Sequence, residues 1–181
     1  SHKFHGVRGV GFVYIKSGKK ITPLLTGGGQ ERDYRSTTEN VAGIAATAKA
    51  LRLSIEKLDI FTSKTGQMKS VIRQALLDYP DIFVFSDEED FAPHILTFGI
   101  KGVRGEVIVH SFEDYDIFIS TTSACSSKAG KPAGTLIAMG VDKDKAQSAV
   151  RLSLDLENDM SQVEQFLTKL KLIYNQTRKV R

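Results

Sequence analysis

The sequence predicts a mixed fold, between α/β and α+β, and three observations support this class. Short runs rich in β-branched and aromatic residues occur at 10–15, 82–85 and 94–98. Between and after them, apolar residues recur at helical spacing. The 181 residues, 41% of them hydrophobic and 25% charged, have a globular composition and suffice for one ample core or two small ones. Strands and helices are therefore expected to pack together.

The first part of the chain is predicted to hold two short strands and a loop. The run 10–15 reads as a strand that ends in a turn at 17–20, and 21–25 is the candidate for its partner strand. The glycine triplet at 27–29 breaks the pattern, and the polar stretch 30–38 follows as a loop. These residues lack the apolar side chains for a core of their own.

One or two helices are predicted over 39–77. Their end is marked by Tyr79 and Pro80, because the residue before a proline disfavours helical backbone. The apolar positions at helical spacing are Val41, Ile44, Ala45, Ala48, Leu51, Met68, Val71, Ile72, Ala75 and Leu76.

The remainder alternates between strands and helices. Strands are predicted at 82–85 and 94–98, and the ambiguous segment 103–112 is assigned to a helix because a strand at 116–119 would then complete an alternating order. A helix at 133–139, a helical turn at 143–146 and a strand at 149–154 follow. The break after Pro80 thus sets off 82–181 as a compact α+β domain.

The last predicted helix, at 160–173, has the clearest pattern of apolar residues. Met160, Val163, Phe166, Leu167, Leu170 and Ile173 form one apolar stripe, which indicates a helix packed against the core. Asp159 and Gln162 stand at the spacing of a capping box.

Charge and cysteine content limit the class of protein. The net charge of +4 (25 basic minus 21 acidic residues) is scattered, so direct nucleic-acid binding is not expected. No apolar run approaches the roughly 20 residues that cross a bilayer. A single cysteine excludes an intrachain disulfide and fits a reducing compartment. We expect a cytoplasmic protein without membrane contact, and a fragment of something longer.

The single cysteine, Cys125, is the most informative residue. It stands in a run of small polar residues closed by Gly130 and Pro132, which is typical of a surface loop, so an exposed nucleophilic thiol is one interpretation. The alternative is an incidental surface cysteine or a small buried apolar residue.

Other candidate residues are weaker when taken singly. Lys3 beside His2 could serve as a Schiff-base amine or be a solvated charge. The 27–29 glycines with the arginines and hydroxyls of 32–38 suit a phosphate or carboxylate, or a plain turn. Arg151, on a predicted strand, could bind a carboxylate or lie free on the surface. The four histidines have no metal-ligand spacing.

Five motifs follow one another in a fixed order along the chain. They are His2-Lys3 before Gly6-Val7-Arg8-Gly9-Val10-Gly11, then Gly27-Gly28-Gly29-Gln30-Glu31, Arg35-Ser36-Thr37-Thr38-Glu39-Asn40, Ser123-Ala124-Cys125-Ser126-Ser127 and Val150-Arg151-Leu152-Ser153. In combination, these motifs resemble the NifS-like cysteine desulfurases, pyridoxal-phosphate enzymes of the class V aminotransferase family and of fold type I. The resemblance spans nearly the whole chain but corresponds to the C-terminal half of such an enzyme.

The resemblance implies a domain organisation. Residues 1–38 would be the remnant of the large cofactor-binding domain, 39–80 linking helices, and 81–181 the small C-terminal α+β domain with the cysteine loop. Because the other half of such an enzyme carries further cofactor contacts, the isolated fragment is expected to be inactive.

The resemblance also implies site roles. Lys3 would hold pyridoxal 5'-phosphate, His2 would lie near this cofactor, and Thr38 would reach the cofactor phosphate of a neighbouring subunit in a homodimer. Arg151 would bind the carboxylate of L-cysteine. Cys125 would take the sulfur as a persulfide, leaving alanine.

Partners and alternatives follow from the same resemblance. The persulfide would pass to a sulfur-acceptor protein, such as a scaffold for iron–sulfur cluster assembly or a tRNA-thiolation protein. The alternatives are a selenocysteine lyase or an aminotransferase of the same family, or a non-catalytic module in the isolated chain.

Overall fold

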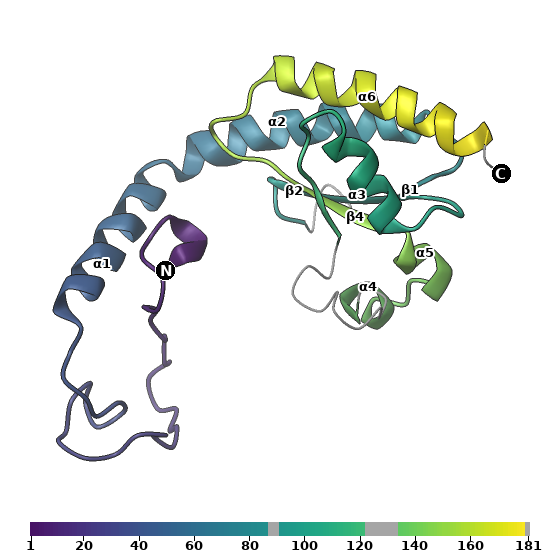
Figure 1. Ribbon diagram of the computed structural model, residues 1–181. Coiled ribbons are helices and arrows are strands. Elements are labelled where there is room, and N and C mark those ends of the chain that lie inside the picture. The colour runs from purple at the N-terminus through teal and green to yellow at the C-terminus, as the bar shows by residue number, and fades with distance from the viewer. Residues whose placement is uncertain (87–90, 122–133, 180–181) are drawn as a thin grey trace. The chain divides into compact units, whose positions relative to one another are not determined.

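A computed structural model describes residues 1–86, 91–121 and 134–179 (Figure 1). The chain forms two compact units, Ser1–Leu58 and Asp59–Arg181. The predicted boundaries at 38 and 80 refer to the domains of a whole enzyme and stay a prediction.

The first unit contains a short 3-10 helix, η1 (His2–Phe4), and the helix α1 (Val41–Glu56). Backbone contacts fold the chain start back on itself, because Ser1 O accepts from the N–H groups of Phe4 and Gly6, each at 3.0 Å. At the start of α1, the Asn40 side chain accepts from the N–H of Gly43 at 3.0 Å, which satisfies one of the donors that a helix start leaves free.

The two strands predicted in this unit are wrong. Residues 10–15 and 21–25 have no strand pairing, and the side chains of Phe12, Val13 and Tyr14 are 65%, 72% and 83% exposed. A β-strand needs a hydrogen-bonded neighbour, and the described residues offer none to these segments. Sequence propensity marked them as strand-like, but pairing decides whether a strand forms.

The second unit is built on an antiparallel sheet. Among the described residues its strands are β1 (Ile82–Val84), β2 (Ile95–Ile100), β3 (Ser120–Thr121) and β4 (Ala149–Ser153). Their order is β1-β2-β4-β3, so β4, the last in sequence, lies between β2 and β3. The register pairs Thr97 with Arg151 and Ser120 with Arg151.

The helices α2 (Leu58–Leu77), α3 (Gly105–Glu113) and α6 (Met160–Lys179) pack against one face of this sheet (Figure 1). Alternation along the strands directs every second side chain toward these helices. The fully buried side chains at the centre of the core are Met68, Ile72, Leu76, Leu96, Phe98, Ile100, Ile108, Phe112, Val150, Leu170 and Ile173. The inner face of α2 thus belongs to the core of the second unit.

Most predicted elements of this unit are confirmed. The ambiguous segment 103–112 forms α3, a helix, and the segment before α6 forms the predicted capping box. Asp159 Oδ1 accepts from the N–H of Gln162 at 3.0 Å, and Gln162 Oε1 accepts from the N–H of Asp159 at 3.3 Å. The predicted strand at 116–119 is wrong, because pairing with β4 begins only at Ser120. Asp116 has a φ of 58°, a left-handed turn that delays the strand.

Two short helices, α4 (Gly134–Ala138) and α5 (Lys143–Gln147), stand where a helix and a helical turn were predicted. Leu136, Ala146 and Ala149 form a small separate cluster with them. Asp142 caps α5, since its Oδ1 accepts from the N–H of Asp144 at 2.9 Å.

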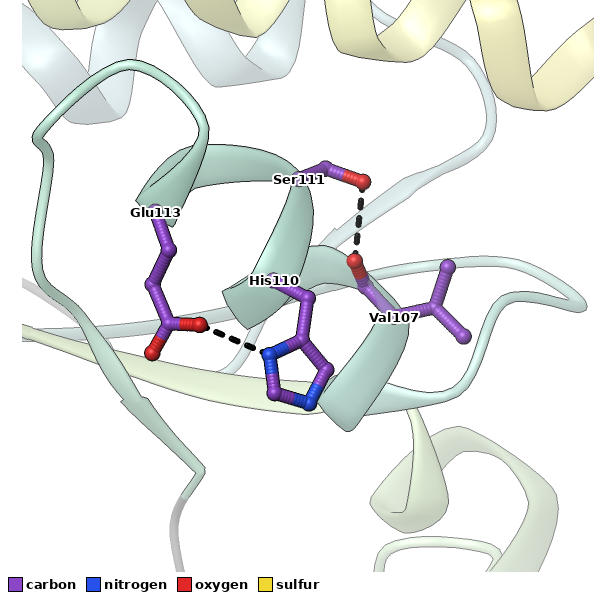
Figure 2. A network of polar contacts seen from close by, with 4 residues as sticks. All are labelled: Val107, His110, Ser111 and Glu113. Carbon is purple, nitrogen blue, oxygen red and sulfur yellow. Dashed lines mark hydrogen bonds and ion pairs between the residues drawn. The ribbon is translucent and has the colours of Figure 1, made fainter.

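The outward face of α3 carries a small polar network (Figure 2). His110 Nδ1 lies 2.7 Å from Glu113 Oε2, and Ser111 Oγ donates to Val107 O at 2.8 Å. The His110 and Glu113 side chains are 76% and 43% exposed, so this pair contributes little to stability.

Candidate active site

The predicted cofactor residues His2 and Lys3 are adjacent on η1, and both are exposed. The turn is held in place by Ser54 of α1, whose Oγ donates to Phe4 O at 3.4 Å. It ends at His5, which has a left-handed φ of 65°. No ion pair or hydrogen bond joins the Lys3 amine to another described residue. The amine is therefore accessible for bond formation.

Thr38 is exposed and precedes α1, at the end opposite to η1. The hydrogen bond from Ser54 places η1 beside the last turns of α1. Ser54 follows Val41 by 13 positions in α1, which corresponds to roughly 20 Å along a helix at 1.5 Å per residue. Within one subunit, the structure thus does not bring Thr38 together with His2 and Lys3.

The glycine-rich loop before Thr38 has an unusual backbone. Glu31, Arg32 and Asp33 are three consecutive left-handed residues, with φ of 51°, 56° and 67°. The Asp33 N–H donates to Gly29 O at 3.3 Å across this turn. Left-handed backbone costs about 1–2 kcal/mol for each such residue, so the surrounding contacts must hold the loop in this form.

A cavity of about 820 Å³ lies between this loop, the segment 10–21 and α1. Its wall is mostly apolar, with Arg32, Arg35 and Lys16 among the charged residues. His2, Lys3 and Thr38 are not in the wall. This cavity is therefore separate from the predicted cofactor residues.

Arg151, the predicted carboxylate-binding residue, lies on β4 and is half-buried. Its strand neighbours Val150 and Leu152 belong to the hydrophobic core, so alternation places Arg151 on the opposite face of the sheet. That face is the one not covered by α2, α3 and α6. Arg151 thus places a cation on the sheet face opposite these three helices, which we call the open face because none of the three covers it.

The guanidinium of Arg151 has an unsatisfied hydrogen-bond donor. Its Nε atom is buried and has no hydrogen-bond partner, and no ion pair joins the side chain to an acidic residue in the described part of the chain. A buried donor without a partner costs about 1–3 kcal/mol, more for a charged group. A carboxylate would satisfy it with a charge-assisted hydrogen bond.

Cys125 lies outside the described residues, as do its neighbours 122–133. β3 ends at Thr121, immediately before this segment, and β3 pairs with the strand that carries Arg151. In sequence, the cysteine thus follows a strand of the same sheet by four residues.

Sequence reasoning missed the neighbours of Arg151 on the open face. Thr97 and Ser120 lie directly opposite Arg151 on the two flanking strands. Apolar–polar alternation along 95–100 was the signal that could have placed Thr97 on this face, but the choice of partner strand needs the sheet order.

The described ranges contain no group of three or more His, Cys, Asp or Glu side chains placed to bind a metal ion. Within the same ranges, no helix has the length and apolar character required to span a bilayer.

Comparison with known proteins places the chain in a family. Residues 1–166 match the model of the aminotransferase class-V family. The chain is 47% identical over 181 residues to a protein of Lactobacillus delbrueckii subsp. bulgaricus described as a NifS/IcsS protein homolog. It is 34% identical over 183 residues to a cysteine desulfurase IscS of Clostridium botulinum. The chain belongs to the aminotransferase class-V family.

A solved structure agrees with this assignment. The fold is similar to that of a NifS-like protein, with a TM-score of 0.79 and 34% sequence identity over 98% of this chain and 44% of that one. The two relatives above are matched over 99% of this chain and over 47% and 46% of their own lengths. The chain thus spans about half the length of the relatives it matches.

Proposed function

We propose that the protein to which this chain belongs is a cysteine desulfurase, a transferase that moves sulfur from L-cysteine to an enzyme thiol and releases alanine. The similarity to relatives with this name along nearly the whole chain supports the reaction class. The structural observation that carries the proposal is the unpartnered Arg151 Nε on the open sheet face, because it fits the carboxylate of an amino-acid substrate.

Pyridoxal 5'-phosphate is the cofactor that we expect His2 and Lys3 to hold. The Lys3 amine is exposed and has no hydrogen bond or ion pair to another described residue, so it is available to form a carbon–nitrogen bond. His2 would contact the cofactor from the same turn. When bound, the cofactor supplies an electron sink for the carbon centre of the substrate.

The residues of this chain would then divide the remaining work. Arg151 would hold the substrate carboxylate with paired N–H donors. Lys3 would move a proton at the substrate Cα. The Cys125 thiolate would form a bond to the substrate sulfur while the carbon–sulfur bond breaks. Overall, L-cysteine and the Cys125 thiol would become alanine and a Cys125 persulfide.

We propose that two copies complete each active site. The roughly 20 Å of α1 between Thr38 and the η1 turn argues against both serving one cofactor within a subunit. In a homodimer, Thr38 would reach the cofactor phosphate held by the neighbouring subunit.

Catalysis would also need the part of the family fold that this chain does not span. The exposed side chains of Phe12, Val13 and Tyr14, on a segment with strand-like sequence, suit a sheet and core completed by that part. The persulfide would then pass to a sulfur-acceptor protein in the cytoplasm.

The experiment combines this chain with the remaining part of the fold and measures alanine release from L-cysteine. Cys125→Ser should abolish alanine release with L-cysteine, and Lys3→Ala should abolish cofactor absorbance as well as turnover. Arg151→Lys, which keeps the charge but loses the fork of donors, should raise KM for L-cysteine about tenfold or more. Unchanged alanine release with Cys125→Ser would instead contradict the role of Cys125 as the sulfur-accepting thiol.

A further inference from the structure

The open face of the sheet carries a polar row that crosses its strands at the level of Arg151. The row consists of Thr97 on β2, Arg151 on β4 and Ser120 on β3, which are directly opposite one another in the register. Leu96 and Phe98 flank Thr97 and are fully buried in the core, so Thr97 itself faces the open side. Ile119, before Ser120, is also a core residue.

Thr97 and Arg151 lie opposite each other at a position of the ladder that has no backbone hydrogen bonds between them. Thr97 O accepts from the N–H of Phe85 at 2.8 Å, and its own N–H donates to Ser86 Oγ at 2.9 Å. Both backbone groups of Thr97 therefore point away from β4, and Thr97 and Arg151 form a non-hydrogen-bonded pair. In such pairs the Cα atoms are about 4.5 Å apart and the side chains are closer than elsewhere in a sheet.

The hydroxyls of this row have no assigned role in the fold. No hydrogen bond joins Thr97 Oγ1 or Ser120 Oγ to any other residue of the described structure. Other hydroxyls on regular elements do bond to the backbone, as Thr65 Oγ1 donates to Phe61 O at 2.6 Å. The Arg151 Nε between them is likewise unpartnered. Three polar groups thus converge on one surface without satisfying one another.

We infer that Thr97 and Ser120 are positioning and specificity residues that form, with Arg151, a seat for a carboxylate. The hydroxyls donate to the carboxylate oxygens while the guanidinium supplies the charge. This seat selects amino acids over amines that lack the carboxylate. The inference rests on the proposed function, because it assigns the groups that hold the substrate in that same site.

Hydroxyl-deleting variants of the cofactor-loaded whole enzyme test the seat. The readout is the change in cofactor absorbance on titration with L-alanine, which carries a carboxylate, and with ethylamine, which does not. Thr97→Val and Ser120→Ala should each weaken L-alanine binding about tenfold, the effect of one hydrogen bond to a charged group, and leave ethylamine binding unchanged. Thr97→Ser keeps a hydroxyl and should restore L-alanine binding.

Thr121→Val is the matched control. Thr121 follows Ser120 on β3 and pairs with the core residue Val150, so its hydroxyl lies off the row. Thr121→Val should bind L-alanine and ethylamine as tightly as the unsubstituted enzyme does. Equal weakening of L-alanine and ethylamine by Thr97→Val and Ser120→Ala would overturn the inference, since it would indicate a distorted sheet.

Arg151→Lys distinguishes a failure of the proposed seat from a failure of the proposed function. If it weakens L-alanine binding while the hydroxyl variants do not, the seat is overturned and the proposed function stands. If it leaves L-alanine binding unchanged, the carboxylate role of Arg151 fails, and with it the structural support for the proposed function.

Discussion

The ring of Phe112 lies nearly parallel to that of Phe166, with centroids 5.0 Å apart and 7° between the ring planes. This contact joins α3 to α6 over the sheet, and Phe166 also meets Phe98 of β2 edge to face at 6.2 Å. One aromatic cluster therefore connects three elements of the second unit.

Truncation of an aromatic side chain in this cluster should lower the stability of the chain. Phe112 is fully buried, so Phe112→Ala removes apolar contacts and leaves a cavity, with an expected loss of about 3–5 kcal/mol in the free energy of unfolding. Urea unfolding of the chain measures it. Phe118→Ala is the control, because Phe118 is 78% exposed and its truncation should change stability by less than about 0.5 kcal/mol. Similar losses for both variants would contradict the described core.

Two glycine substitutions should have opposite effects. A Cβ at Gly99 would lie 2.2 Å from Ser148 Oγ and 3.0 Å from its backbone oxygen, so Gly99→Ala forces the strand apart and should cost about 1–3 kcal/mol. A Cβ at Gly66, inside α2, meets nothing closer than Pro93 at 3.8 Å. Gly66→Ala should stabilise the chain by about 0.5–1 kcal/mol, as measured by the same urea titration.

The stability of the chain should depend on pH through His94. Burial lowers the pKa of His94, and Lys69 acts in the same direction while Asp155 opposes it. The Nδ1 atom is buried without a hydrogen-bond partner in the described structure, and the ring packs on Phe61 with centroids 5.1 Å apart. The folded state therefore holds this histidine neutral at neutral pH.

Proton uptake by the unfolded state decides in which direction the free energy of unfolding changes with pH. As pH falls below about 6.5, the unfolded state takes up a proton at His94 before the folded state does, so the free energy of unfolding falls until the lowered pKa is passed. His94→Gln should flatten this part of the pH profile measured by thermal unfolding. An unchanged slope in His94→Gln would refute the assignment.

The capping box of α6 should also lose stability as pH falls, but in a lower pH range than His94 does. Hydrogen bonds from Ser161 and from the N–H of Gln162 lower the pKa of Asp159. Its contribution is present above the ordinary carboxyl pKa of about 3.9 and is lost as pH falls toward the lowered value. Asp159→Asn keeps the capping oxygen but cannot titrate, so its unfolding midpoint should change less than the parent's between pH 5 and 3. Asp159→Ala should lower the midpoint at both pH values.

Local signals in the sequence determined much of the second unit. The α6 stripe and its Asp159–Gln162 cap depend on residues three or four positions apart, and such neighbours meet in any helix. The β-branched residues of 103–112 favour a strand, but the order of the surrounding elements predicted a helix there. Motif order also pointed to the aminotransferase class-V family and to Lys3, Arg151 and Cys125 as the chemistry-bearing residues.

Tertiary structure decided which strands form and which residues flank Arg151, because both depend on residues far apart in the chain. The segment 10–15 has strand-like residues but no strand in the described chain, because backbone pairing and not propensity forms a ladder. Thr97 and Ser120 became neighbours of Arg151 only through the β1-β2-β4-β3 order. Side chains on a strand alternate by local geometry, but which strands flank it is fixed by packing between residues far apart in the chain.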